Sequence, residues 1–119
     1  MRKYNNTKVF LDGKTFDSVR EAKRFQELRL LEEAGAIYDL QTQVKFVLIP
    51  AQREPDTQGP RGGTRRGRLI EKECAYIADF CYRDEYGFHV EDSKGFRTKD
   101  YVIKRKLMLF AHGIKIEEV

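Results

Sequence analysis

Tyr76-Ile-Ala-Asp-Phe-Cys-Tyr82 and, after a short gap, Phe88-His-Val-Glu-Asp-Ser-Lys-Gly95 are the most informative stretches of the chain. Both combine β-branched and aromatic residues in a way that is typical of strands, and the residues between them suit a turn, so one hairpin is expected. Successive side chains of a strand point to opposite faces, which places Asp92 and Lys94 on the same face. Pairing of the two strands then brings Asp79 close to both of them.

Two carboxylates and one ammonium group would thus converge at the end of an apolar hairpin. Hydrolysis of a phosphodiester needs an activated water and stabilisation of developing negative charge, and Mg²⁺, which prefers oxygen ligands, meets both needs. We expect Asp79 and Asp92 to be metal ligands, together with the backbone carbonyl of Ser93, and Lys94 to orient the water or offset charge. The pattern alone is weakly specific, and its alternative is an exposed, salt-bridged hairpin end. These residues predict a small metal-dependent nuclease.

Three further residues have two interpretations each. Glu21, on a predicted helix, is a candidate catalytic residue and a further metal ligand, but Ser18 and Glu21 also have the spacing of a capping box. Gln43 precedes a predicted strand, where it could contact a metal-bound water or a phosphate, or simply bond to backbone at the strand edge. Glu91 is the rival of Asp92 for the acidic role, and alternation disfavours it unless a bulge shifts the register.

Outside the hairpin, the chain alternates between helical and strand patterns. The predicted fold is α/β (α+β), with the core order helix-strand-strand-strand-helix-strand, a central mixed sheet flanked by helices, and a short N-terminal hairpin. The second helix is expected to begin after a cap at Thr98 or Asp100 and to bury Ile103, Leu107 and Phe110. The predicted elements are a hairpin over Lys8–Asp17 with its turn at Asp12-Gly13, a helix over residues 19–34, a central strand Val44–Ile49, the hairpin strands Glu71–Tyr82 and Gly87–Lys94, the second helix ending at Gly113, and a strand Ile114–Ile116.

Basic residues concentrate in two segments beside the predicted site. Residues 51–70 hold prolines and four glycines with five arginines against two acidic residues, and are expected to form a flexible loop or arm. The second helix carries a basic face. Either surface could be merely solvated, but neutralisation of DNA phosphates, with salt-sensitive and largely sequence-independent affinity, is the simpler interpretation. The predicted DNA-binding residues are Arg61, Arg65, Arg66, Arg68, Lys99, Lys104, Arg105 and Lys106.

Length and composition limit the class of protein. The 119 residues, of which 40% are hydrophobic and 35% charged, are expected to form a single domain over 1–119. The formal charge of +4 is compatible with a polyanionic partner. No apolar run reaches the length of a membrane span and no signal peptide is evident, so a cytoplasmic location without a membrane partner is expected. Cys74 and Cys81 lack neighbouring ligands, which argues against zinc and against a disulfide.

The motifs on the two hairpin strands resemble those of the PD-(D/E)XK nuclease superfamily, which shares the predicted element order. Asp79 corresponds to the first motif and Asp92-Ser-Lys94 to the D-x-K motif. Two positions depart from the usual pattern without removing a ligand: Ala78 stands where proline is usual, and Asp92 where Glu is commoner. The chain also resembles a family of small phage and prophage proteins over nearly its whole length, apart from Ala51–Arg68. The stretches that carry this resemblance are Asp12-Gly13, Phe16-Asp-Ser18, Glu21-Ala22, Leu40-Gln-Thr-Gln43, Tyr76-Ile-Ala-Asp-Phe80, Glu91-Asp-Ser-Lys-Gly95 and Tyr101-Val-Ile-Lys-Arg-Lys106.

The resemblance implies a restriction-endonuclease-like core and a Mg²⁺-dependent endonuclease in which Mn²⁺ can replace Mg²⁺. The superfamily includes Holliday-junction resolvases, which implies branched or junction DNA as substrate, in phage recombination or replication in the host cytoplasm. A homodimer is expected because resolving a junction takes two symmetric nicks. Two alternatives stay open: a non-catalytic DNA-binding accessory protein of recombination, and a structural phage protein that uses the arginine-rich arm for assembly. The enzyme is favoured because binding alone has no need for clustered acidic groups, which repel phosphate.

Overall fold

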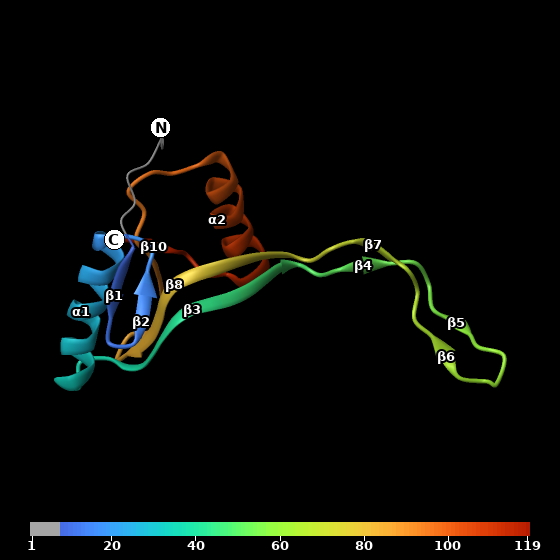
Figure 1. The fold of residues 1–119 in the computed structure, drawn as a ribbon, viewed down its shortest axis with the longest axis horizontal. Coiled ribbons are helices and arrows are strands. Elements are labelled where there is room, and N and C mark those ends of the chain that lie inside the picture. The colour runs from blue at the N-terminus through green and yellow to red at the C-terminus, as the bar shows by residue number, and fades with distance from the viewer. Residues whose placement is uncertain (1–7) are drawn as a thin grey trace.

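A four-stranded mixed sheet forms the centre of the protein, and both helices contact it (Figure 1). The computed structural model describes residues 8–119. The strand order is β10-β9-β8-β3, with β10 parallel to β9 and the other pairs antiparallel. The chain is therefore an α+β protein, as predicted. The sheet strands are β3 (Tyr38–Ile49), β8 (Cys74–Asp84), β9 (Gly87–Asp92) and β10 (Glu117–Glu118), and the helices are α1 (Val19–Glu33) and α2 (Lys99–His112).

The predicted central hairpin is present, but β8 begins three residues and ends two residues later than predicted, and β9 ends at Asp92, so Lys94 lies just beyond the strand. Strands β8 and β9 pair in a register that runs from Phe80 opposite Glu91 to Asp84 opposite Gly87. At the turn, Asp84 Oδ1 accepts hydrogen bonds from the backbone nitrogens of Tyr86 (2.8 Å) and Gly87 (3.1 Å), which stabilises the reversal of the chain. This hairpin lies in the middle of the sheet, so it fixes the positions of the candidate site residues.

The N-terminal hairpin and the first helix also agree with the sequence pattern. Strands β1 (Val9–Leu11) and β2 (Lys14–Phe16) are joined by Asp12 and Gly13, whose positive φ angles of 52° and 76° are those of a tight hairpin turn. Helix α1 ends before Gly35, which has a φ of 79°. At its start, Ser18 Oγ accepts a hydrogen bond of 3.1 Å from the backbone nitrogen of Glu21.

Two further strands differ from the prediction in position. Strand β3 begins at Tyr38, six residues before the predicted Val44, and it lies at an edge of the sheet, whereas β8 and β9 are central. The apolar residues of Val44–Ile49 suggest a central strand, but their burial comes from packing of α2 on one face of the sheet and not from a further paired strand. The last strand pairs at Glu117–Glu118 and not at Ile114–Ile116, since the two isoleucines pack into the core instead.

The apolar face predicted for the second helix is wrong for Ile103 and Phe110, whereas Leu107 is half-buried and packs against the core as predicted. Helix α2 begins after Thr98, whose Oγ accepts from the backbone nitrogen of Tyr101, and it buries Tyr101 and Met108, while Ile103 and Phe110 are 58% and 87% exposed. Positions two apart on a helix point about 200° apart, so the two apolar stripes lie on nearly opposite sides. The ring centroid of Tyr101 lies 6.4 Å from that of Tyr76, so the stripe that contains Tyr101 and Met108 faces the sheet. Neither helix in residues 8–119 is long and apolar enough to cross a membrane.

Two apolar clusters hold the helices to the sheet, and they exchange places along β3 and β8. Simple alternation would put Ala78 and Phe80 on one face, yet Ala78 packs with α2 residues and Phe80 with α1 residues. Leu40 and Val44 of the neighbouring strand divide in the same way. The change coincides with Gln43, whose φ of 54° is left-handed. At this point of the sheet, side chains from the two sides can meet.

The arginine-rich segment forms a narrow two-stranded arm that extends from the body (Figure 1). Sequence pattern predicts a loop at residues 51–70, whereas the structure has four short paired strands there. Within residues 8–119, the strands of the arm contact mainly one another. The arm makes the molecule 59 Å long against 44 and 30 Å in the other directions. Its strands are β4 (Gln52–Arg53) with β7 (Leu69–Glu71), and β5 (Thr57–Gln58) with β6 (Thr64–Arg65).

Candidate functional site

Asp92 is a buried carboxylate with one oxygen left without a hydrogen bond. It ends β9 and is 2% exposed. The hydroxyl of Tyr76 donates a hydrogen bond to Oδ2. Oδ1 has no hydrogen-bond donor within residues 8–119, and its nearest charge is Lys94 Nζ at 3.5 Å. An ionised carboxylate in such a place requires compensation by a cation, which the lysine supplies in part.

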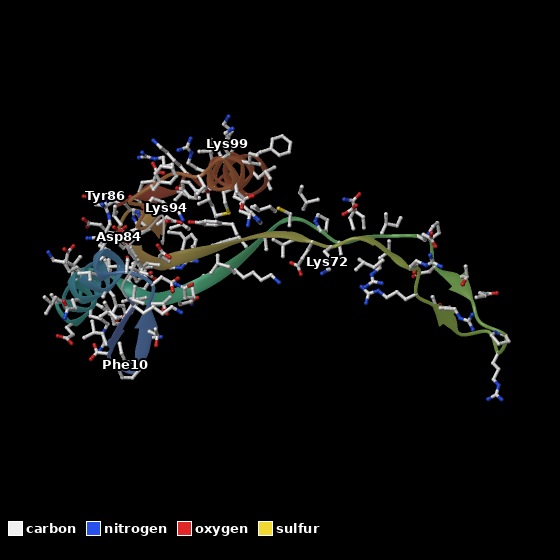
Figure 2. All side chains as sticks on the ribbon, turned by 45° about the horizontal axis from the view of Figure 1, so that its top comes forward. Phe10, Lys72, Asp84, Tyr86, Lys94 and Lys99 are labelled. Carbon is white, nitrogen blue, oxygen red and sulfur yellow. The ribbon has the colours of Figure 1, made fainter. Side chains whose placement is uncertain are left out.

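Lys94 is held by an aromatic ring as well as by charge. Its Nζ lies 4.7 Å from the ring centroid of Tyr101 on α2, within the range of a cation–π interaction. The side chain of Lys94 remains partly exposed, so its ammonium group can reach a bound molecule. Figure 2 shows Lys94 on the body of the protein and Lys72 near the base of the arm.

Asp79 lies at the point where the two clusters change faces. Its Oδ2 accepts a hydrogen bond of 2.8 Å from the backbone nitrogen of Ser93, which ties β8 to the end of β9. Burial, together with the negative charges of Asp92 and Glu21, raises the pKa of Asp79 to about 7, against the lowering effects of the Ser93 hydrogen bond and of Lys94. Near neutral pH this group therefore exchanges a proton readily, and a cation beside it would favour the ionised form.

Glu21 reaches the same place from α1. It is 4% exposed, and its Oε1 accepts a hydrogen bond of 2.9 Å from Gln43 Nε2, while Oε2 accepts one of 3.3 Å from the backbone nitrogen of Asp17. Burial raises the pKa of Glu21, and repulsion by Asp17 and Asp92 adds to the effect. The serine half of the predicted capping box is present, but the Glu21 carboxylate turns to Asp17 and Gln43. Glu21 thus supports the start of the helix and also interacts with Asp79 and Asp92. These three carboxylates form the acidic cluster.

The predicted residues Asp79, Asp92, Lys94 and Glu21 therefore come together. The charges of the other three all contribute to the pKa shift of Asp79. In residues 8–119, however, no three His, Cys, Asp or Glu side chains converge closely enough to enclose a metal ion as they stand. Ser93 contributes its backbone nitrogen to the cluster, and the role of its carbonyl stays a prediction.

Glu91 belongs to a different network on the opposite face, as alternation predicts. It is 1% exposed and accepts two hydrogen bonds from Arg24, at 2.8 Å from Nε and 2.7 Å from Nη2, and one from the hydroxyl of Tyr82. Both carboxylate oxygens of Glu91 are thereby paired. This residue anchors α1 to the hairpin, and it leaves no oxygen free for a ligand.

The predicted DNA-binding residues fall into two groups. The four arginines of the distal arm that were predicted to bind DNA (Arg61, Arg65, Arg66 and Arg68) are exposed and form no ion pair within the described part of the chain. On α2, Lys99 and Lys106 are exposed, whereas the other two basic groups have acidic partners. Those pairs are Lys104 with Asp100 at 3.8 Å and Arg105 with Glu118 at 3.6 Å. The positive charge of the arm is therefore less compensated than that of the helix.

The contacts of Tyr76 with Asp92 and of Tyr101 with Lys94 were not predicted from the sequence. Both tyrosines are buried. A buried tyrosine needs a partner for its hydroxyl, and this need was the available signal, since Asp92 is the polar group at the end of the adjacent strand. The contact between Tyr101 and Lys94 depends on how α2 is rotated about its axis, which the local sequence does not determine.

Comparison with known proteins yields one match. The family described as "Protein of unknown function (DUF1064)" matches residues 1–115, which is nearly the whole chain. Neither the curated proteins nor the solved structures contain a significant match. The match includes the three carboxylates of the acidic cluster and Lys94. The chain belongs to the DUF1064 family.

Proposed function

We propose that the protein is a Mg²⁺-dependent DNA endonuclease that hydrolyses phosphodiester bonds, related to the PD-(D/E)XK superfamily. The observation that carries this proposal is the buried Asp92, whose Oδ1 accepts no hydrogen bond from residues 8–119 and faces Lys94 Nζ at 3.5 Å. A carboxylate kept in this condition costs stability unless a ligand uses it. The neighbouring Asp79 and Glu21 supply the additional negative charge that a divalent cation would need.

The residues present fit a hard divalent cation. Asp79, Asp92 and Glu21 offer carboxylate oxygens, and the Ser93 carbonyl is a further candidate ligand. Because Tyr76 occupies Oδ2 of Asp92, Oδ1 is the oxygen that remains for the ion. When bound, Mg²⁺ would lower the pKa of a coordinated water and offset negative charge on the phosphate. Binding would also keep Asp79 ionised, since a positive charge opposes the effects that raise its pKa.

Lys94 is the side chain proposed to act directly on the reacting groups. Its ammonium group is fixed between Asp92 and the ring of Tyr101, so it can donate a hydrogen bond to the attacking water or to a phosphate oxygen without a change of position. Gln43 holds Glu21 in place through its amide nitrogen and is a candidate for a second contact to the bound water. Lys94 is therefore proposed as the catalytic residue, and Gln43 as a positioning residue.

DNA is the proposed substrate because the uncompensated positive charge lies on the arm and on the exposed side of α2. Branched or junction DNA, a role in phage recombination or replication, and a homodimer that places two sites on one junction follow from the resemblance to resolvases. These parts of the proposal have separate tests. Substrate choice is read from cleavage of junction, nicked and linear DNA, and the oligomeric state from the mass in solution.

The decisive experiment is cleavage of junction, nicked and linear duplex DNA with and without Mg²⁺ or Mn²⁺. Cleavage that needs the ion and is lost in Asp79→Ala, Asp92→Asn and Lys94→Ala supports the proposal. Matched controls are Asp100→Asn and Lys72→Ala, which remove an exposed carboxylate and an exposed ammonium group elsewhere. If no substrate is cut, or if the site variants cut as well as the controls, the endonuclease proposal fails.

A non-catalytic DNA-binding accessory protein is the second candidate function. The observation that favours it is that no three potential ligands in residues 8–119 enclose an ion as they stand. In that case the acidic cluster only stabilises the packing of α1 on the hairpin, and Asp92→Asn should leave the biological function intact. DNA binding that is the same with and without Mg²⁺, without cleavage, would favour this candidate.

A further inference from the structure

The charges of the arm are separated along its length. The distal part, residues 57–68, contains four arginines and no acidic residue, whereas the base of the arm has two basic residues against four acidic ones. The positive charge is therefore concentrated at the far end and is not spread along the ribbon. The distal basic residues are Arg61, Arg65, Arg66 and Arg68, and the charged residues of the base are Arg53, Glu54, Asp56, Glu71, Lys72 and Glu73.

The distal part is a built structure that holds these arginines in place. At the tip, the backbone nitrogen of Gly59 donates to the Gly63 carbonyl at 2.6 Å. At the junction with the base, the backbone nitrogen of Gly67 donates to Asp56 Oδ1 at 2.8 Å, and its carbonyl accepts from Arg53 at 3.1 Å. A Cβ on Gly67 would lie 1.7 Å from the Glu54 carbonyl oxygen, so only glycine lets the two strands approach this closely.

The composition of residues 57–68 limits what this end of the arm can bind. It has no aromatic side chain, and single-stranded nucleic acid is bound mainly by stacking of bases on aromatic rings. It also lacks the large apolar residues that anchor protein interfaces or membrane surfaces. What remains is a narrow antiparallel ribbon with four exposed guanidinium groups that have no acidic partner within the described residues. Guanidinium groups suit phosphates and the acceptor edges of bases.

We propose that the distal ribbon, residues 57–68, lies in the major groove of double-helical DNA and holds a duplex segment away from the acidic cluster. The major groove of B-form DNA is about 12 Å wide and admits a two-stranded ribbon. The major groove of double-stranded RNA is too narrow and deep for side chains to reach into. The long dimension of 59 Å corresponds to about 17 base pairs at a rise of about 3.4 Å, so arm and body can engage the same duplex. This inference deepens the proposed function, since it names duplex DNA as the ligand of the arm.

Binding is measured in EDTA, so that its outcome is independent of cleavage. The probes are a DNA duplex of about 30 base pairs, its single strands, and an RNA duplex of the same sequence. The full chain should bind the DNA duplex tightest. The variant with all four distal arginines changed to alanine should lose about tenfold or more in affinity, reduce the slope of log K against log salt by about 3 to 4, and shorten the footprint on the duplex.

A pair of glycine variants separates an ordered ribbon from mere charge. Gly67→Ala keeps every arginine but cannot keep the close strand approach, whereas Gly63→Ala meets no atom within 4 Å. We expect Gly67→Ala to weaken duplex binding severalfold and Gly63→Ala to leave it unchanged. Equal binding by the two variants would overturn the groove model.

Two other results would also overturn it. One is binding of single strands or RNA that is as tight and as dependent on the four arginines. The other is unchanged duplex affinity and salt slope in the four-arginine variant, which would leave the arm to another class of partner such as an acidic protein. If arm-dependent duplex binding is found and no DNA is cleaved, this inference stands and the endonuclease proposal fails.

Discussion

The hydroxyl of Tyr76 donates a hydrogen bond to Oδ2 of Asp92, and both side chains are buried. A second tyrosine makes the same kind of bond on the other network of the hairpin, where Tyr82 donates to Glu91. The two pairs are chemically alike, but Glu91 is also neutralised by Arg24, whereas Asp92 keeps an oxygen that no donor in the described part of the chain reaches. This difference separates a structural carboxylate from one that is available to a ligand.

Tyr76→Phe and Tyr82→Phe should therefore destabilise the protein similarly and differ in function. Each leaves a buried carboxylate without one donor, at a cost of about 1–3 kcal/mol in the free energy of unfolding. Only Tyr76→Phe should weaken binding of Mn²⁺, because it removes the hydrogen bond that holds the Asp92 carboxylate with Oδ1 toward Lys94. Titration calorimetry with Mn²⁺, beside urea unfolding of both variants, checks this. Equal Mn²⁺ affinity in the two variants would contradict the role given to Tyr76.

The raised pKa of Asp79 predicts a pH-dependent stability. Its pKa is about 7 in the folded protein and about 3.9 in an unfolded chain, so the folded state binds the proton more tightly. The contribution of Asp79 to the free energy of unfolding should thus be greatest below about pH 4 and should be lost as the pH rises through 7. Asp79→Asn should remove most of this decline and be more stable than the unchanged protein at pH of about 8.

Urea unfolding across this pH range provides the measurement for Asp79. Asp100→Asn is the control, because its carboxylate is on the exposed side of α2 and should leave the pH profile unchanged. A profile in Asp79→Asn that declines as steeply as that of the unchanged protein would show that another group causes it. Addition of Mg²⁺ at neutral pH should stabilise the unchanged protein and not the variant.

Arg24 should matter for stability and not for the proposed chemistry. Its removal in Arg24→Ala leaves the buried Glu91 with only Tyr82 as partner, and loss of one member of a buried pair costs about 3–5 kcal/mol. Thermal or urea unfolding should show this loss. Glu27, the other partner of Arg24, is exposed, and Glu27→Gln should change stability by less than about 1 kcal/mol. A large loss of stability in Glu27→Gln would mean that the Arg24–Glu27 pair, and not the Arg24–Glu91 pair, is the main source of stability.

Lys94 should contribute to rate more than to DNA affinity. We expect Lys94→Ala to lower the cleavage rate by about 10²–10³, the range seen when one electrostatic donor is removed from an active site. Tyr101→Leu should give a smaller loss, because it removes the ring beside the ammonium group but not the charge. Single-turnover cleavage and DNA binding in EDTA separate the two effects. A loss confined to binding would assign Lys94 to phosphate contact alone.

The central hairpin could be predicted from sequence because its information is local. Alternation, a turn signal and strand propensity act within a few residues, and they place Asp79, Asp92 and Lys94 together and Glu91 apart, as the structure has them. The same holds for the cap at Ser18 and the turn at Asp12-Gly13. These parts of the fold need no knowledge of the rest of the chain.

The remaining features depend on contacts between distant segments. Helix α2 has two apolar stripes, and only its packing beside Tyr76 shows which one is buried. The left-handed backbone at Gln43 has no sequence signal, because glutamine rarely adopts it. Pairing within the arm was not predicted because prolines and glycines usually mark loops. Here the absence of a side chain at Gly67 instead allows the two strands to approach closely.

Strands β3 and β8 pair from the bend at Gln43 and Asp79 to the foot of the arm, with one shift of register between Val47 and Ile49. A ligand held by the arm is therefore connected to Asp79 through a single pair of strands. A change in the twist of that pair on ligand binding would alter the distance from Asp79 to Glu21 and Asp92.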